Sequence, residues 1–205
     1  MRYLEFRDKF SDFIVFTQRQ IKQLEPDFND GLLYRWQKKG YIKKICKGHY
    51  IFCEQKIDEL ILFHLANKIY EPSYISMEQA FSYYNLIPET VYGITSISTK
   101  KTQIIKSSVA TFYYNNLKPD LFWGYKLISY DGINIKIAEI EKCILDYLKL
   151  KAHINSTEQF RGLRIDLENL RKQVDLEKFY SYLDKFKNKT LNKKVKNFIK
   201  AIDFD

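Results

Sequence analysis

Apolar residues in the first quarter of the chain recur first at helical spacing and then at strand spacing. Three helices followed by two strands are predicted, over residues 3–13, 18–25, 30–39, 41–45 and 49–52. Thr17 is a candidate N-cap of the second helix, Gly40 is placed to end the third, and Lys47-Gly48 is the expected turn between the strands. This order of elements is typical of a winged helix-turn-helix, which we predict for residues 1–56.

In such a module the third helix enters the major groove of DNA. Leu32, Leu33 and Trp36 share one face of this helix and are predicted to be buried, so Tyr34 or Arg35 could contact base edges. Cationic side chains on the two-stranded ribbon would contact phosphates. The predicted DNA-binding residues are Asn29, Tyr34, Arg35, Lys38, Lys43, Lys44, Lys47 and His49. Winged helices also serve as protein-interaction units, so the pattern alone leaves that alternative open.

Two helices flank a strand-rich stretch in the middle of the chain. Residues 57–70 are amphipathic and predict a helix that links the N-terminal module to the rest of a second domain, residues 57–205. The dipeptide Asp131-Gly132 predicts a tight hairpin, and residues 138–150 predict the second helix. We therefore expect residues 71–152 to form a mixed core with a small antiparallel sheet.

The stretch PSYISMEQAFSYY, residues 72–84, predicts a helix entered from an extended segment. Ser76 is a candidate N-cap, and Gln79 would complete a capping box with it. Met77, Ala80 and Phe81 lie on one apolar face of the helix. Residues 91–99 are then strand-like in composition.

This stretch resembles the signature of AbiEi-type antitoxins, which belong to type IV abortive-infection toxin–antitoxin systems. The resemblance continues in LIPE at residues 86–89, in AEIEKCILD at 138–146 and in the helix–Gly–ribbon segment WQKKGYIKKICKGHY at 36–50. It covers about residues 10–150 as many short matches in fixed order. The pair Glu141-Lys142 resembles the family's EK pair, although its spacing also fits an exposed helical pair.

The resemblance implies an antitoxin that counteracts a nucleotidyltransferase toxin, its genetic partner, and that represses its own operon by binding operator DNA. It does not imply direct binding of the toxin. The alternative that the residues leave open is a protein-interaction module, without DNA binding, that neutralises an acidic protein partner by direct contact.

The C-terminal part, residues 153–205, is predicted to be helical. Ser156 or Thr157 would cap a helix that runs to about Arg171, and Asp175 begins another. Residues 191–202 predict a basic amphipathic helix, which suits nucleic acid, an acidic partner or a solvated face. Candidate partner or nucleic-acid contacts are Lys100, Lys101, Lys193, Lys194, Lys196 and Lys200.

The net charge of +9 is concentrated at the two ends of the chain. Residues 1–56 carry a net charge of +5, residues 57–152 of 0 and residues 153–205 of +4. A basic excess of this size favours a polyanionic partner, because neutralising phosphates releases counterions.

The sequence contains no motif that identifies an enzyme. The phosphate-binding patterns GxxxxGK[ST] and GxGxxG are missing, as are HExxH and GxSxG, and the chain has only 7 glycines. We therefore expect no catalytic residues, no metal and no cofactor. The N-terminal residues lack a basic segment followed by an apolar run, and the three cysteines show no metal-ligand spacing. We expect a cytoplasmic protein that has no membrane partner.

Overall fold

The computed structural model describes residues 1–88 and 92–202. The N-terminal part contains three helices and a three-stranded antiparallel sheet with the strand order β1-β3-β2. Its elements are α1 (Tyr3–Phe10), β1 (Phe16–Thr17), α2 (Gln18–Leu24), α3 (Gly31–Lys38), β2 (Ile42–Cys46) and β3 (His49–Phe52). The predicted helices and strands all form, and the short strand β1 between α1 and α2 is an addition to them.

Aromatic side chains hold this N-terminal part together. The rings of Phe6 and Phe10 stack with 4.5 Å between their centroids, and Phe16 and Trp36 pack against Phe6. Leu4 lies two residues before Phe6, which places it about 200° away around α1. Since Phe6 faces this cluster, the Leu4 side chain faces the other way and is 66% exposed. The helix also ends at Phe10, three residues before the predicted end.

The middle of the chain forms a six-stranded mixed sheet, so the predicted small antiparallel sheet is wrong in size and in strand direction. The strand order is β6-β7-β5-β4-β9-β8, and the pairs β4/β9 and β5/β7 are parallel. The strands are β4 (Ser73–Ile75), β5 (Ile94–Ser98), β6 (Gln103–Lys106), β7 (Thr111–Asn116), β8 (Tyr125–Tyr130) and β9 (Ile133–Ala138). The sheet is mixed because β4 is antiparallel to β5 but parallel to β9, and β5 is parallel to β7. The start of the predicted strand, Val91, lies outside the described residues.

The hairpin β8–β9 forms as predicted. Asp131 and Gly132 both have positive φ values, 46° and 75°, as the turn between two antiparallel strands with a right-handed twist requires. Tyr130 pairs with Ile133 directly across this turn.

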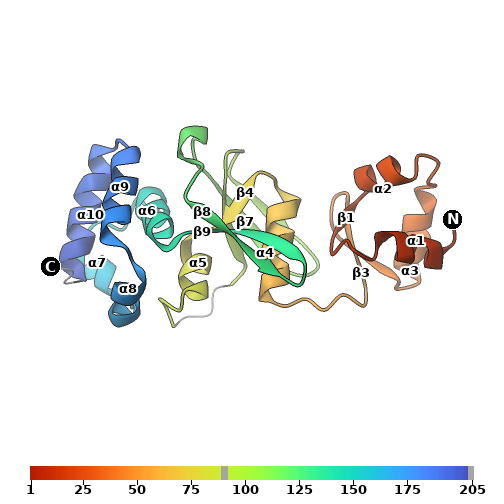
Figure 1. The fold of residues 1–205 in the computed structure, drawn as a ribbon, viewed down its shortest axis with the longest axis horizontal. Coiled ribbons are helices and arrows are strands. Elements are labelled where there is room, and N and C mark those ends of the chain that lie inside the picture. The colour runs from red at the N-terminus through yellow and green to blue at the C-terminus, as the bar shows by residue number, and fades with distance from the viewer. Residues whose placement is uncertain (89–91, 203–205) are drawn as a thin grey trace.

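Helices cover the sheet, and a group of C-terminal helices lies beyond it (Figure 1). The helix α4 (Glu59–Ile69) packs against β4, β5 and β9, so it covers the sheet as well as connecting the N-terminal part to it. The helices α5 (Met77–Tyr83) and α6 (Ile140–Leu150) pack against each other. Figure 1 shows the N-terminal module and the C-terminal helices at opposite ends of the molecule.

The C-terminal end is helical, as predicted, but one expected helix is divided in two. The helices are α7 (Thr157–Arg161), α8 (Leu167–Gln173), α9 (Leu176–Lys185) and α10 (Lys189–Ala201). Arg164 has a φ of +51°, which ends the helical path after α7, and the backbone nitrogen of Asp166 donates to the carbonyl of Leu86. Ser156 caps α7 and Asp175 caps α9, as predicted.

The capping box predicted at Ser76 is wrong, although Ser76 does occupy the N-cap position of α5. Its hydroxyl makes no cap bond and instead donates to Asp146 Oδ2 at 3.1 Å. The amide of Gln79 donates to Glu59 rather than bonding to Ser76. Both side chains are buried, and each bonds a carboxylate contributed by another helix.

Candidate nucleic-acid interface

The orientation of α3 agrees with the prediction from its apolar spacing. Leu33 and Trp36 are 2% and 5% exposed, and Leu32 is partly buried against the same aromatic cluster. The opposite side of the helix carries Tyr34, which is 63% exposed, together with Arg35 and Lys38. The ammonium of Lys38 lies 5.6 Å from the Tyr34 ring centroid, one turn away.

Local hydrogen bonds fix both ends of α3. The side-chain oxygen of Asn29 accepts from the backbone nitrogen of Gly31 at 2.8 Å, so this side chain stabilises the start of the helix and remains exposed. At the other end Gly40 has a φ of +70°, and the backbone nitrogen of Tyr41 donates to the carbonyl of Trp36 at 2.9 Å. This bond joins the end of α3 to the start of β2.

The register of β2 against β3 separates two predicted contacts. Lys44 pairs with Tyr50, which lies in the aromatic cluster beneath the helices, whereas Lys43 pairs with Ile51, which belongs to the core of the middle domain. Side chains directly opposite each other in an antiparallel pair lie on the same face of the sheet. Lys44 therefore lies on the face that α3 covers, and Lys43 lies on the other face.

The turn of the ribbon presents Lys47 and partly buries His49. The Nδ1 atom of His49 lies 3.0 Å from the carbonyl oxygen of Lys47 and 3.6 Å from Cys46 Sγ. These contacts hold the imidazole against its own turn. Lys47 is exposed at the tip.

A cationic, partly aromatic surface therefore joins α3 to one face of the ribbon. It consists of Tyr34, Arg35, Lys38, Lys44 and Lys47, all exposed. We call these five residues the α3–ribbon surface. Its chemistry suits phosphate oxygens and base edges, because guanidinium and ammonium groups donate to both. Of the predicted residues, Asn29 and His49 lie beside this surface with a side-chain atom already engaged, and Lys43 is turned away from it.

The C-terminal lysines do not act as one group. Lys194 is only 7% exposed, and its ammonium donates to the carbonyl oxygens of Leu148 and Lys151 at 3.1 and 2.8 Å. Lys194 therefore caps the C-terminal end of α6, and its assignment as a partner contact is wrong. Burial lowers the pKa of this ammonium.

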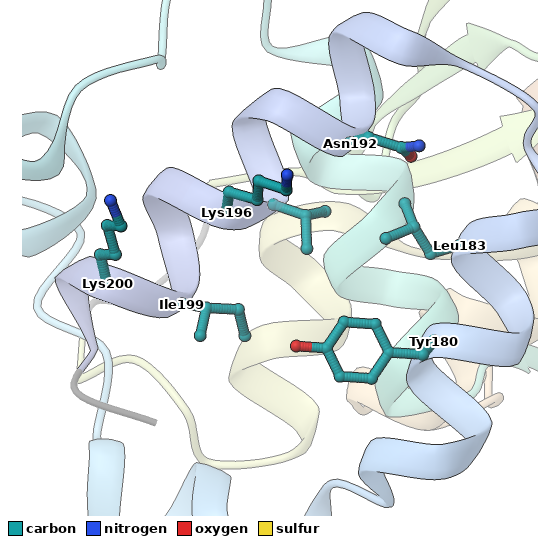
Figure 2. Close-up of a pocket in the computed structure, with 7 residues that line it drawn as sticks. Tyr180, Leu183, Asn192, Lys196, Ile199 and Lys200 are labelled. Atoms are coloured by element: carbon teal, nitrogen blue, oxygen red, sulfur yellow. The ribbon is translucent and has the colours of Figure 1, made fainter. Parts of the chain in front are cut away.

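Lys193, Lys196 and Lys200 are exposed on α10, as predicted. Figure 2 shows Lys196 and Lys200 beside an open groove of about 350 Å³ between α9 and α10, with Tyr180 and Leu183 on its other side. Since α9 and α10 lie at the far end of the molecule from α3 (Figure 1), these lysines and the α3–ribbon surface are separate regions.

Lys100 and Lys101 are exposed and follow β5. The ammonium of Lys100 lies 5.3 Å from the ring centroid of Tyr70, whose hydroxyl donates to the carbonyl oxygen of Lys101 at 3.0 Å. Both are accessible, and they belong neither to the α3–ribbon surface nor to α10.

A buried polar cluster, which no local sequence pattern predicts, lies between β4 and α6. Lys142 and Asp146 form an ion pair with no exposure of either side chain, and the hydroxyls of Tyr74 and Ser76 donate to Asp146 Oδ2. Burial raises the pKa of the Asp146 carboxyl and lowers the pKa of Lys142, while their mutual attraction opposes both shifts. Glu141 is also buried, so the exposed-pair interpretation of Glu141-Lys142 is wrong. This cluster is enclosed and presents no group to a ligand.

Within the described ranges, residues 1–88 and 92–202, no group of three or more His, Cys, Asp or Glu side chains could hold a metal ion. The same ranges contain no helix that is long and apolar enough to cross a bilayer. No protein-family model matches the chain, and no curated protein matches it.

Proposed function

We propose that this protein is the antitoxin of a toxin–antitoxin pair, and that it represses its own operon through a winged helix-turn-helix formed by residues 1–56. The toxin is a nucleotidyltransferase. The sequence resemblance to AbiEi-type antitoxins supports the choice of system, and the α3–ribbon surface supports the DNA-binding role.

The observation that carries the DNA-binding role is the exposure of Tyr34, Arg35 and Lys38 on α3 beside the cations of the ribbon. A helix whose apolar side is anchored by Trp36 presents its polar side in a fixed orientation, as insertion into a major groove needs. Lys44 and Lys47 then lie where a ribbon contacts the flanking phosphates.

The test is a titration of the full-length protein with DNA from upstream of its own gene, at two salt concentrations. Replacing Arg35→Ala together with Lys44→Ala should weaken binding, and the loss of the Lys44 phosphate contact should reduce the slope of log affinity against log salt by about 1. The matched control is Lys106→Ala with Lys118→Ala, which removes two exposed cations elsewhere.

Equal affinity and slope in both double variants would contradict the proposal of a DNA-binding winged helix. Failure of the wild-type protein to bind the upstream DNA at either salt concentration favours the protein-interaction alternative.

The proposal separates repression from neutralisation. The Arg35→Ala, Lys44→Ala variant, expressed from an unrelated promoter, should still protect cells from the toxin, because those side chains act on operator DNA. Loss of protection by a folded variant would show instead that the α3–ribbon surface acts on the toxin or its target.

A further inference from the structure

A second site lies on the middle domain, at the N-terminal end of α4. A pocket of about 550 Å³ opens there between α4, α5, β5 and the residues leading into β7. It is lined by Ile57, Asp58, Glu59, Leu62, Gln79, Tyr92, Gly93, Ile94, Val109, Ala110, Thr111 and Tyr113. None of these described lining residues is Lys or Arg, although the chain carries a net charge of +9. Its described wall therefore carries two carboxylates, Asp58 and Glu59, and no cationic side chain.

The two carboxylates at its wall are held by hydrogen bonds. Asp58 Oδ1 accepts from the backbone nitrogen of Ile61 at 2.8 Å, and the hydroxyl of Tyr130 donates to Asp58 Oδ2. The bond from Tyr130 and then the bond from Ile61 lower the pKa of Asp58, so this carboxylate is ionised at neutral pH. Glu59 Oε1 accepts from Gln79 Nε2 at 2.8 Å.

Helix capping accounts for Asp58 but not for Gln79. The Gln79 side chain is 3% exposed, and its Oε1 has no hydrogen-bond partner among the described residues. The amide orientation is fixed, since turning it over would place its oxygen against the Glu59 carboxylate. A buried acceptor without a donor is destabilising, so a donor supplied from the pocket would satisfy Gln79 Oε1.

Aromatic rings form the outer wall. Tyr113 is 37% exposed and Tyr92 is 91% exposed. Gly93 has a φ of +81°, and a Cβ atom there would lie 2.6 Å from Tyr113 Cε2 and 2.7 Å from the carbonyl oxygen of Thr111. The absence of a side chain at Gly93 therefore lets the Tyr113 ring lie directly against this backbone.

The geometry points to a receptor pocket for an arginine side chain of a partner protein. A guanidinium is planar and has several N–H donors, so it can donate to Gln79 Oε1 and to the Glu59 carboxylate together. Its face can also stack on a tyrosine ring. A lysine ammonium lacks the fork and the flat face, and a neutral donor gains nothing from the two carboxylates. The exposed Tyr92 and Tyr113 at the rim are residue types enriched at protein–protein contacts, which favours a protein-borne arginine.

The pocket shares no residue with the α3–ribbon surface, so different variants test the two proposals. Its failure would leave the proposed repressor function untouched, and the reverse also holds.

The test is a nuclear magnetic resonance titration of the full-length protein with N-acetyl-arginine-N-methylamide, which presents the side chain as a peptide does. The side-chain amide signals of Gln79, identified by their loss in Gln79→Met, should shift in a saturable way. The matched citrulline compound keeps the shape and loses the charge, and the matched lysine compound keeps the charge and loses the fork. Both should bind at least about tenfold more weakly, because charge-assisted hydrogen bonds are lost.

Two variants locate the binding. Glu59→Gln keeps an acceptor for Gln79 Nε2 and removes the charge, so the protein should stay folded and lose at least about tenfold in affinity for the arginine compound. Glu71→Gln removes an exposed carboxylate beyond the other end of α4 and should leave the affinity unchanged. Equal binding of arginine and citrulline, equal binding of arginine and lysine, an equal effect of the two variants, or no shift of the Gln79 amide would overturn the assignment.

Discussion

Lys142 and Asp146 lie one turn apart on α6 and form an ion pair in which neither side chain is exposed to solvent. The Lys142 ammonium also donates to the hydroxyl of Tyr74 at 2.8 Å, and that hydroxyl donates to Asp146 Oδ2 at 2.8 Å. The three groups thus join α6 to the central strand β4. A buried pair of this kind costs free energy to desolvate, yet it costs more to leave one charge without its partner.

We predict that breaking the pair destabilises the protein more than replacing it. Lys142→Met should lower the free energy of unfolding by about 3–5 kcal/mol, because the Asp146 charge is left buried without its cation. Lys142→Met combined with Asp146→Asn removes both charges and keeps an acceptor for the Tyr74 and Ser76 hydroxyls, so it should recover part of that loss. Urea denaturation of the variants measures both effects, and a double variant less stable than Lys142→Met would contradict the prediction.

A second prediction separates two neighbouring lysines of α10. Lys194→Ala should destabilise the protein by about 1–3 kcal/mol, because the carbonyl oxygens of Leu148 and Lys151 lose a charged donor. Lys193→Ala removes an exposed side chain and should change the free energy of unfolding by less than about 0.5 kcal/mol. Chemical denaturation distinguishes them, and similar values for both would show that Lys194 contributes no more than a solvated lysine.

The two lysines also show where sequence reasoning reaches its limit. The amphipathic helix predicted at residues 191–202 forms within α10, with Leu191, Val195 and Phe198 on its buried side. That prediction treated Lys194 as one of a set of solvent-facing lysines, because a lysine is normally excluded from a core. The acceptors that make its burial favourable lie about 45 residues earlier in the chain, at the end of α6, where no local pattern connects them to Lys194.

The same reason explains the errors around Ser76 and Glu141. Spacing correctly indicated that Ser76 begins a helix and that residues 138–150 contain another. The strand order then brings β4 beside β9, through the parallel pairing of Ile75 with Ile137, and places Asp146 next to Ser76. Such pairings between distant segments decide which polar side chains become internal, and they cannot be inferred from helical or strand periodicity.

The candidate interface was easier to predict than this core, because it depends on local structure. The positions of Leu33 and Trp36 on one side of α3 determine that Tyr34, Arg35 and Lys38 lie on the other. The distinction between Lys43 and Lys44 depends on the pairing of β2 with β3, and the irregularity between Lys44 and Cys46 makes that register hard to infer.

This register gives a third prediction, which adds single variants to the double variant that tests DNA binding. Lys44→Ala should weaken binding to the upstream DNA and lower the salt slope by about 1, since Lys44 lies on the face of the ribbon that carries α3. Lys43→Ala should leave the slope unchanged, because its side chain lies on the opposite face. Fluorescence anisotropy over a range of salt concentrations measures both slopes. A larger effect of Lys43→Ala would mean that the DNA contacts the other face of the ribbon.

The fourth prediction concerns His64, which lies on α4 and is 7% exposed. Burial lowers the pKa of its imidazole below the ordinary value of 6.5, and the contact of Nδ1 with the carbonyl oxygen of Asn134 at 3.4 Å opposes this only in part. The folded protein therefore favours the neutral imidazole. The unfolded chain takes up the proton first as pH falls, so His64 contributes stability above pH 6.5 and loses it as pH falls through the folded-state pKa.

We expect urea denaturation at about pH 7.5 and about pH 5.5 to show a smaller loss of stability on acidification in His64→Gln than in the wild-type protein. His153→Gln is the matched control, because that histidine is exposed, and it should keep the wild-type dependence. If His64→Gln instead loses as much stability on acidification as His153→Gln does, the buried imidazole does not cause the acid sensitivity of the fold.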